Sequence, residues 1–425
     1  MKDLSLYIHI PFCVKKCNYC DFLSAPCDGS TKQRYVDALC KEIKQKSELF
    51  QKRKVDTVFF GGGTPSILSP EQIEQIMSAV KKNFQVLPNA EISMEINPGT
   101  VDREKLETYK RLEINRLSIG LQSANNEELK VLGRIHTWEE FVQTWELVRE
   151  VGFSNVNIDL MSALPGQTLE SYEETLRKVL ALRPEHISAY SLIVEEGTLF
   201  YKWFGDEEKQ SWKDECVKEV EELALNSEWI ELKNRKLPDE ITDREMYELT
   251  KKMLEEQGYY RYEISNYAMK GYECKHNIGY WKRKEYLGLG LGAASLIGSQ
   301  RWSNISDLSI YLDVAKQQEE EFQALSPDGI IKYREKNARW LEEQTILSRT
   351  DQMEEFMFLG LRMMEGVSTE EFETCFGKSL QEVYGEQIVT LEKQGLIKFN
   401  KEMKQYALTT QGIDVSNQVF VEFLL

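Results

Sequence analysis

Apolar residues in the first two hundred positions form short runs that are separated by longer amphipathic segments. Six such runs, rich in β-branched and aromatic residues, occur at 4–10, 55–60, 90–96, 114–121, 155–161 and 186–194. Intervening segments such as LESYEETLRKVLALR repeat with the spacing of an amphipathic helix. The alternation predicts six parallel βα units.

Six units predict an α/β fold with a partial (β/α)6 barrel rather than a closed barrel of eight strands. Ligands of such folds collect at the carboxyl ends of the strands. Polar or conformationally special residues stand at these ends: Cys13 to Cys20, Gly61 to Pro65, Glu95, Asn97, Gln122 and Asp159. We therefore expect a ligand site at this edge of the sheet.

The predicted barrel spans 1–200. The chain after it divides into three segments that differ in composition and hydrophobic pattern. Residues 201–240 are dense in Lys, Glu and Asp and predict a charged helical insertion. Residues 241–309 are expected to associate with the barrel. Two helical patterns followed by the short strands IKFN and QYALT predict an α-helical, winged-helix-like domain at 310–425.

Composition narrows the classes of function. The chain has 425 residues, 41% hydrophobic and 29% charged, which fits one large and one smaller globular domain. A formal charge of -17 disfavours nucleic acid as a partner, including DNA at the winged-helix-like domain. We expect no transmembrane segment or export signal, and hence a cytoplasmic protein whose cysteines are thiols or metal ligands.

The segment CVKKCNYC places Cys13, Cys17 and Cys20 on one loop after the first strand. Clustered thiolates suit an iron-sulfur cluster or zinc. Structural zinc would need a fourth donor, such as Cys27 or His9. On a four-iron cluster, three thiolates would leave one iron open to a small molecule.

The segment FFGGGTPS ends the second strand with three glycines, where a ligand can approach the backbone amides. A tight turn before the next helix explains the same glycines. Four polar residues lie at or near other strand ends: Glu95, Gln122, Arg134 and Asp159. Each fits an ordinary ion pair, but together they could hydrogen-bond an amino acid and a ribose.

The segment HNIGYW combines an imidazole and two aromatic rings in what we expect to be a short loop. Its four candidate residues are His276, Asn277, Tyr280 and Trp281. A lone histidine is usually structural, but haem needs an axial ligand and flat packing surfaces. The residues alone leave both interpretations open.

The segments YIHIPFCVKKCNYCDF, GGGTPS, EINPGT, RLSIGLQS and NIDLMSALPGQT resemble the radical S-adenosylmethionine (SAM) family that contains oxygen-independent coproporphyrinogen oxidases. This resemblance implies a 4Fe-4S cluster on Cys13, Cys17 and Cys20, with SAM on its fourth iron. It also implies SAM contacts from Tyr7, Gly62, Gly63, Thr64, Glu95, Gln122, Arg134 and Asp159.

The oxidases of that family carry a fourth cysteine two residues after the third, where this chain has Phe22. Because of this departure and the segments YRYEISNYA and HNIGYW, the chain resembles the HemW-type haem chaperones. The resemblance implies haem contacts from the four HNIGYW residues and delivery of haem to acceptor proteins. Alternatives are a coproporphyrinogen III dehydrogenase, another radical SAM enzyme acting on a tetrapyrrole, and a zinc-stabilised binding protein. A homodimer is compatible with all of them.

Overall fold

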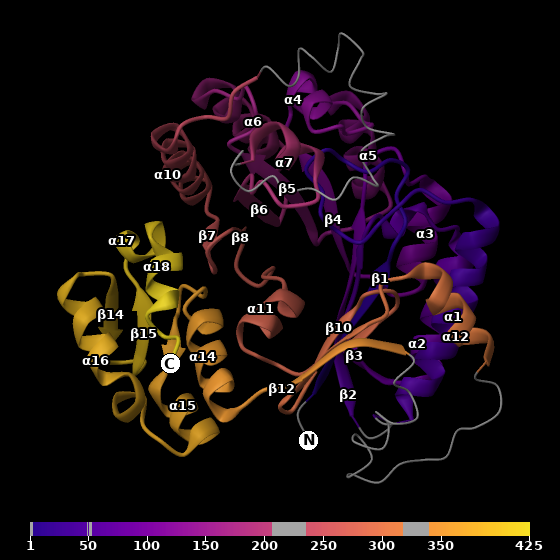
Figure 1. The fold of residues 1–425 in the computed structure, drawn as a ribbon. Coiled ribbons are helices and arrows are strands. Elements are labelled where there is room, and N and C mark those ends of the chain that lie inside the picture. The colour runs from indigo at the N-terminus through magenta and orange to yellow at the C-terminus, as the bar shows by residue number, and fades with distance from the viewer. Residues whose placement is uncertain (1–2, 49, 51–52, 206–234, 318–339) are drawn as a thin grey trace.

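The computed structural model describes residues 3–48, 50, 53–205, 235–317 and 340–425 (Figure 1). Its large sheet has twelve strands in the order β12-β11-β10-β9-β1-β2-β3-β4-β5-β6-β8-β7. They are β1 (Leu4–Ile10), β2 (Lys54–Gly62), β3 (Gln85–Ile96), β4 (Arg116–Gln122), β5 (Val156–Ser162), β6 (His186–Ser191), β7 (Tyr260–Arg261), β8 (Asn266–Ala268), β9 (Tyr286–Leu289), β10 (Ala294–Ile297), β11 (Gln300–Asn304) and β12 (Leu341–Ile346).

Strands β1 to β6 are parallel and lie in chain order, which confirms the partial barrel expected from the six apolar runs. The sequence did not reveal that β9 pairs in parallel with the other edge of β1. Antiparallel strands extend both edges: β10 to β12 beyond β9, and β8 and β7 beyond β6. The barrel is therefore wider than six strands.

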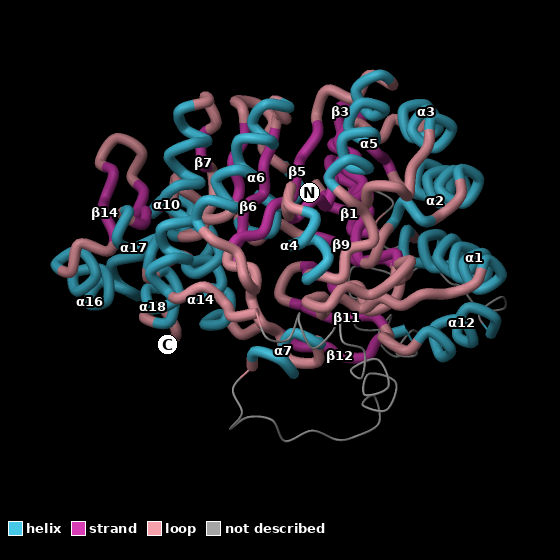
Figure 2. Tube along the Cα trace, turned by 90° about the horizontal axis from the view of Figure 1, so that it is seen from above, coloured by secondary structure: helices cyan, strands magenta, loops and turns pink. Residues whose placement is uncertain are grey.

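Most helices lie outside the strands, as Figure 2 shows from above, whereas α11 (Lys275–Trp281) carries a residue that faces the inside of the barrel. In the barrel part they are α1 (Gly29–Ser47), α2 (Pro70–Asn83), α3 (Arg103–Arg111), α4 (Asn126–Val131), α5 (Trp138–Glu150), α6 (Leu169–Leu182), α7 (Leu199–Phe204), α10 (Glu240–Glu256), α11 (Lys275–Trp281) and α12 (Leu308–Gln317). Local sequence sets their starts: Ser69 and Thr137 begin α2 and α5 with capping boxes.

Alternation along β1 explains where the core ends and the site begins. Leu4, Leu6, Ile8 and Ile10 are fully buried and belong to the main hydrophobic core, which also contains the apolar face of α1. Because successive side chains of a strand point to opposite faces, the alternate residues Ser5, Tyr7 and His9 point into the barrel instead. The outer face of the sheet is apolar, and its inner face is free to carry polar chemistry.

The C-terminal domain, yellow in Figure 1, has its own core and a three-stranded sheet in the order β13-β15-β14. Its elements are α14 (Arg349–Gly360), β13 (Val367–Ser368), α15 (Thr369–Phe376), α16 (Leu380–Lys393), β14 (Ile397–Asn400), β15 (Gln405–Leu408), α17 (Thr410–Asp414) and α18 (Ser416–Val421). The helices followed by a hairpin confirm the winged-helix-like pattern.

One of the expected domain boundaries lies elsewhere in the structure, and one expected segment falls mostly outside the described residues. β12 belongs to the large sheet, so we place the start of the C-terminal domain near residue 347 rather than at residue 310. Most of the charged insertion predicted at 201–240 falls on 206–234, outside the described residues. Among the residues that are described, no helix is long and apolar enough to cross a membrane.

Candidate cofactor site

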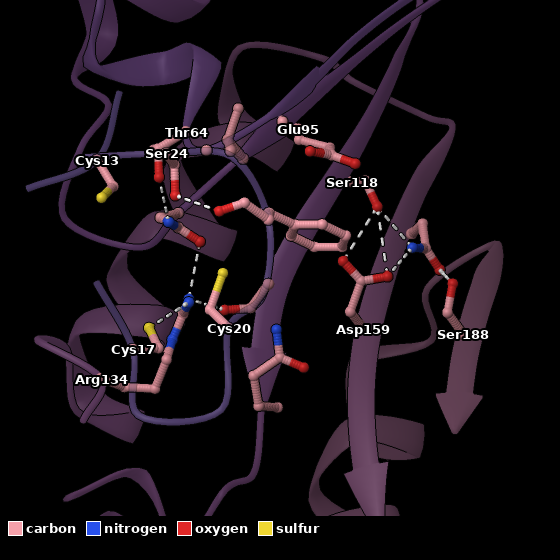
Figure 3. A pocket seen from close by; sticks show the side chains of 18 of the residues that line it. Cys13, Cys17, Cys20, Ser24, Thr64, Glu95, Ser118, Arg134, Asp159 and Ser188 are labelled. Atoms are coloured by element: carbon pink, nitrogen blue, oxygen red, sulfur yellow. Dashed lines mark hydrogen bonds between the residues drawn. The ribbon is translucent and has the colours of Figure 1, made fainter. Parts of the chain in front are cut away.

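A cavity of about 340 Å³ lies at the carboxyl ends of the parallel strands (Figure 3). Its lining comes from the loop after β1, from strands β2 to β6, from β8 and from α11. All three predicted cluster ligands line it. So do seven of the eight predicted SAM contacts: Gly62, Gly63, Thr64, Glu95, Gln122, Arg134 and Asp159. The polar residues of separate strand ends thus meet in one place.

The loop that carries Cys13, Cys17 and Cys20 is held to the barrel by hydrogen bonds on both sides. Asn18 donates from its side chain to the carbonyl of Val131 at 2.8 Å, and its backbone amide donates to Leu132. On the far side, His9 Nε2 donates to the carbonyl of Leu23 at 2.9 Å. Sequence reasoning missed Asn18, because an asparagine between two cysteines carries no distinctive signal.

The three thiols are free of disulfides, and Figure 3 shows them around one end of the cavity, with Arg134 beside Cys17. Among the described residues, no three His, Cys, Asp or Glu side chains are placed to hold one metal ion. Three thiols from one loop suit a cubane cluster, because each thiolate then binds a different iron atom.

Charge at the thiols also fits an electron-rich cluster. Arg134 Nη1 lies 3.7 Å from Cys17 Sγ and brings a positive charge next to this sulfur atom. Burial raises the pKa of the Cys13 and Cys20 thiols, so these two thiols keep their protons near neutral pH and release them when the sulfur binds a metal.

Gly62 and Gly63 permit a close approach that any side chain would block. Gly62 has φ +112°, and a Cβ there would lie 2.7 Å from the His9 ring. A Cβ on Gly63 would lie 2.5 Å from the carbonyl oxygen of Phe12, in the cysteine loop. The glycines therefore let the loop after β2 pack directly under the cysteine loop. The side chain of Thr64, which follows, accepts a hydrogen bond from Asn97 at 2.8 Å.

Arg134 lies at the centre of a hydrogen-bonded group beside the cysteine loop. Its Nη2 donates to Asn97 Oδ1 at 2.7 Å and to the carbonyl of Gly120 at 2.5 Å. Gln122, at the end of β4, has φ +74° at a register shift against β5 and accepts a hydrogen bond from Tyr190 at 3.2 Å. A left-handed residue that is not glycine stores strain, a feature typical of functional sites.

Two carboxyl groups lie deeper in the cavity. Burial, reinforced by Asp159, raises the pKa of Glu95 to about 8, so this group is mostly protonated at neutral pH and can donate a hydrogen bond. Burial also raises the pKa of Asp159, while hydrogen bonds from Asn157 and from two serines oppose that rise. Ser118 donates to Asp159 Oδ2 at 3.2 Å (Figure 3). Such groups can hydrogen-bond hydroxyls and ammonium groups of a ligand.

Tyr7 is the one predicted SAM residue that does not line the cavity. Its hydroxyl donates to His9 Nδ1 at 3.0 Å, and its ring lies within 6.3 Å of the Phe59 ring, measured between centroids. A Cβ on Gly61 would lie 3.0 Å from the Tyr7 ring. In this structure Tyr7 therefore packs behind the loop after β2 and orients His9.

The segment HNIGYW forms the helix α11, so the expectation of a loop was wrong. Only Asn277 lines the cavity. The His276 ring is buried: Nδ1 pairs with Thr57 at 2.9 Å and Nε2 with Tyr280 at 3.0 Å. Trp281 faces the C-terminal domain, with the Arg362 guanidinium 4.5 Å from its ring. Neither nitrogen of His276 is free to bind a metal in this conformation.

Comparison with known proteins agrees with this geometry. The family model of the Radical SAM superfamily matches residues 7–179, and that of the HemN C-terminal domain matches residues 347–415. Coproporphyrinogen III oxidase (HemN) from Escherichia coli shares the fold, with a TM-score of 0.77 and 24% identity over 100% of this chain and 90% of that one. Barrel, cysteine loop and family match together define a radical SAM protein.

Two relatives narrow the class further. Heme chaperone HemW of Lactococcus lactis is 35% identical over 100% of this chain and 98% of its own length. Heme chaperone HemW of Bacillus subtilis is 35% identical over 99% of both chains. The chain belongs to the HemW family of the radical SAM superfamily. That membership implies a 4Fe-4S cluster and SAM as cofactors, and the residues of the cavity fit both.

Proposed function

We propose that this chain is a haem chaperone that binds a 4Fe-4S cluster, SAM and haem, and delivers haem to acceptor proteins. The observation that carries the proposal is the similarity to two heme chaperones along practically their whole length, at 35% identity. Phe22 adds support, because it is 61% exposed at the position where the resembling oxidases carry a fourth cysteine.

In this proposal Cys13, Cys17 and Cys20 hold the cluster, whose open iron supplies a site for the amino and carboxylate groups of SAM. Seven residues of the cavity contact SAM: Gly62, Gly63, Thr64, Glu95, Gln122, Arg134 and Asp159. Tyr7 supports them from below through His9. Arg134 holds the Cys17 side of the loop against β4 and thereby fixes the distance between cluster and ligand.

For haem, the lining of the cavity supports a contact from Asn277. His276, Tyr280 and Trp281 are part of the proposed haem site only if α11 moves, because each is packed against a neighbour in the described structure. We place haem at the cavity face of α11. A cytoplasmic location and haem-accepting partners belong to the same proposal, and a homodimer stays a prediction.

An anaerobic haem titration of the cluster-reconstituted protein, followed by absorbance, tests this function. We expect saturable binding and transfer of the bound haem to apomyoglobin, seen as the absorbance change of the reconstituted acceptor. The Cys375→Ala protein is a matched control, because this exposed cysteine lies in the C-terminal domain. Absence of haem binding contradicts the proposal. Porphyrin product formed from coproporphyrinogen under reducing conditions would favour the dehydrogenase instead.

A further inference from the structure

The cavity continues below the residues assigned to SAM. On β4, alternate residues face it, from Gln122 at the carboxyl end through Gly120 and Ser118 to Arg116 at the opposite end. Six residues of extended strand separate Arg116 from Gln122 by roughly 20 Å. At the lower end, which we call the floor, the lining residues are Arg116, Asn157, Ser188, Asn266 and Asn277. None of these five is assigned to SAM, and Asp159 adjoins them through its hydrogen bond from Asn157.

Arg116 brings a buried positive charge to this floor. The residue is 2% exposed, and among the described residues no ion pair or hydrogen bond to its guanidinium is found; its Nε is buried without a partner. Taking a charge out of water without pairing it is costly. A cavity-lining guanidinium without a direct hydrogen-bonded partner can therefore accept the anionic group of a ligand.

Two carboxylates interact with Arg116 over a longer distance, but both already accept hydrogen bonds from other groups. Glu91 accepts the backbone amides of Lys275 and His276, at 2.9 and 3.1 Å, at the start of α11. Asp159 accepts the amide of Asn157 at 2.7 Å and the hydroxyl of Ser118. Neither is placed to form a direct pair with Arg116.

Polar atoms of two asparagines complete the floor. Asn277 lines the cavity, and within the described part of the chain no hydrogen bond to its side-chain amide is found. The side-chain oxygen of Asn266 is buried without a partner. The floor thus offers charged and neutral donors together with an acceptor, a set that recognises a small planar polar group.

We propose that the floor is a carboxylate-binding subsite in which Arg116, with Asn277, holds the anionic group of a second ligand next to SAM. The planar guanidinium matches a carboxylate through two parallel hydrogen bonds. A phosphate would usually meet several cations, whereas the other cations that line the described cavity, Lys15, Lys16 and Arg134, belong to the cysteine loop and its edge. The carboxylate of SAM is assigned to the cluster iron and is not the occupant.

Two sources could supply the carboxylate: a propionate group of haem, or a separate small carboxylic acid. Only the first source rests on the proposed haem function. The primary test uses cluster-reconstituted, SAM-loaded protein and compares propionate with its neutral amide, propionamide, as ligands in thermal unfolding. We expect a saturable rise of the unfolding midpoint with propionate and none with propionamide.

Variants assign that response to the floor. Arg116→Gln should weaken propionate binding about tenfold to a hundredfold, as for the loss of a charge-assisted hydrogen bond, with a smaller loss in Arg116→Lys. Arg177→Gln, which removes an exposed cation on α6 outside this cavity, should leave the response unchanged. Iron content and SAM affinity check that each variant is folded. An equal response to propionate and propionamide in the unmodified protein overturns the subsite even if Arg116→Gln fails to fold.

Haem and its dimethyl ester distinguish the sources. If a haem propionate occupies the floor, esterification should weaken haem binding about tenfold in the unmodified protein and have no further effect in Arg116→Gln. If haem and its ester bind alike while propionate still stabilises the protein, a separate acid is the ligand. A propionate response without any haem binding supports the subsite and contradicts the proposed haem function.

Discussion

The cysteine loop and helix α11 both carry motifs rich in ligand-type side chains, yet they present them in opposite ways. The loop turns three free thiols toward the cavity. Helix α11 turns one asparagine toward the cavity and uses its histidine and aromatic rings for packing. A motif of binding residue types can thus be an exposed ligand set or a scaffold.

The physical difference lies in how each segment satisfies its polar groups. The cysteine loop is tied down by its backbone and by residues between or beside the thiols, so the sulfur atoms stay available. In α11, the side chains themselves make the hydrogen bonds and packing contacts that hold the helix in place. The helix lies between the barrel and the C-terminal domain in Figure 1, where Lys282 and Arg283 pair with Glu365 and Glu355.

Removal of a cluster ligand should give the largest effect and should leave the fold intact. Cys17→Ala is expected to lose essentially all cluster iron and sulfide, because two thiolates cannot hold the cluster. The free energy of unfolding of the cluster-free protein should change by less than about 1 kcal/mol, since the Cys17 thiol is half-buried. Iron and sulfide analysis after anaerobic reconstitution measures this. Full cluster content in the variant would contradict the assignment.

A substitution in α11 should lower the free energy of unfolding and leave the cluster content unchanged. His276→Ala removes two hydrogen bonds and the stacking on Phe59, so the free energy of unfolding should fall by roughly 2–4 kcal/mol. Cluster content of the folded variant should be unchanged. Urea unfolding of the cluster-free protein gives the stability. A variant that keeps full stability but loses haem binding would make His276 a haem ligand rather than a packing residue.

Lowered pH should reduce the free energy of unfolding through His276 in α11. Burial, with Lys284 and Arg116 nearby, lowers the pKa of His276 to about 3, so its folded pKa lies below the value near 6.5 of an unfolded chain. Below pH 6.5 the unfolded state binds the extra proton, and stability is lost as pH falls toward 3. His276→Gln should reduce this loss by about 1 kcal/mol per pH unit between pH 6 and pH 5. Equal pH slopes for variant and unmodified protein would show that the ring is accessible to protons when folded.

The smallest effect on stability is expected at the residue of α11 that faces the cavity. Asn277→Ala should change the free energy of unfolding by less than about 0.5 kcal/mol, because no hydrogen bond to its side chain is found among the described residues. Haem binding should weaken severalfold in the same variant. Titration and urea unfolding of one preparation measure both. A large loss of stability would place Asn277 with the scaffold.

Periodicity was sufficient to predict the parallel part of the barrel. Each of the six apolar runs became a strand, because runs that are buried on the outer face must pack against helices. The periodicity of apolar residues was insufficient to predict β9 to β12, because these strands are short and several of their partners lie far away in the chain. The start of the C-terminal domain near residue 347 was missed for the same reason, since β12 joins the large sheet through long-range pairing alone.

Candidate site residues were predictable where position and chemistry coincided. Glu95, Gln122 and Asp159 could be found because polar residues at the carboxyl ends of parallel strands meet at one edge. His276 was chosen for its residue type, and the sequence could not show that Thr57 would take one of its nitrogens. Arg116 escaped notice because a charged residue at the start of a strand is usually solvated, whereas this one points inward.

The place of β1 within the large sheet bears on how the protein is made on the ribosome. β1 pairs with β2 on one side and with β9 on the other, and β9 begins only at Tyr286. At about 5–20 residues per second, synthesis reaches β9 on the order of ten to sixty seconds after β1 has emerged. During that interval the strand that leads into the cysteine loop has one unpaired edge, so a nascent chain has time to receive iron and sulfide before the last parallel strand pairs with β1.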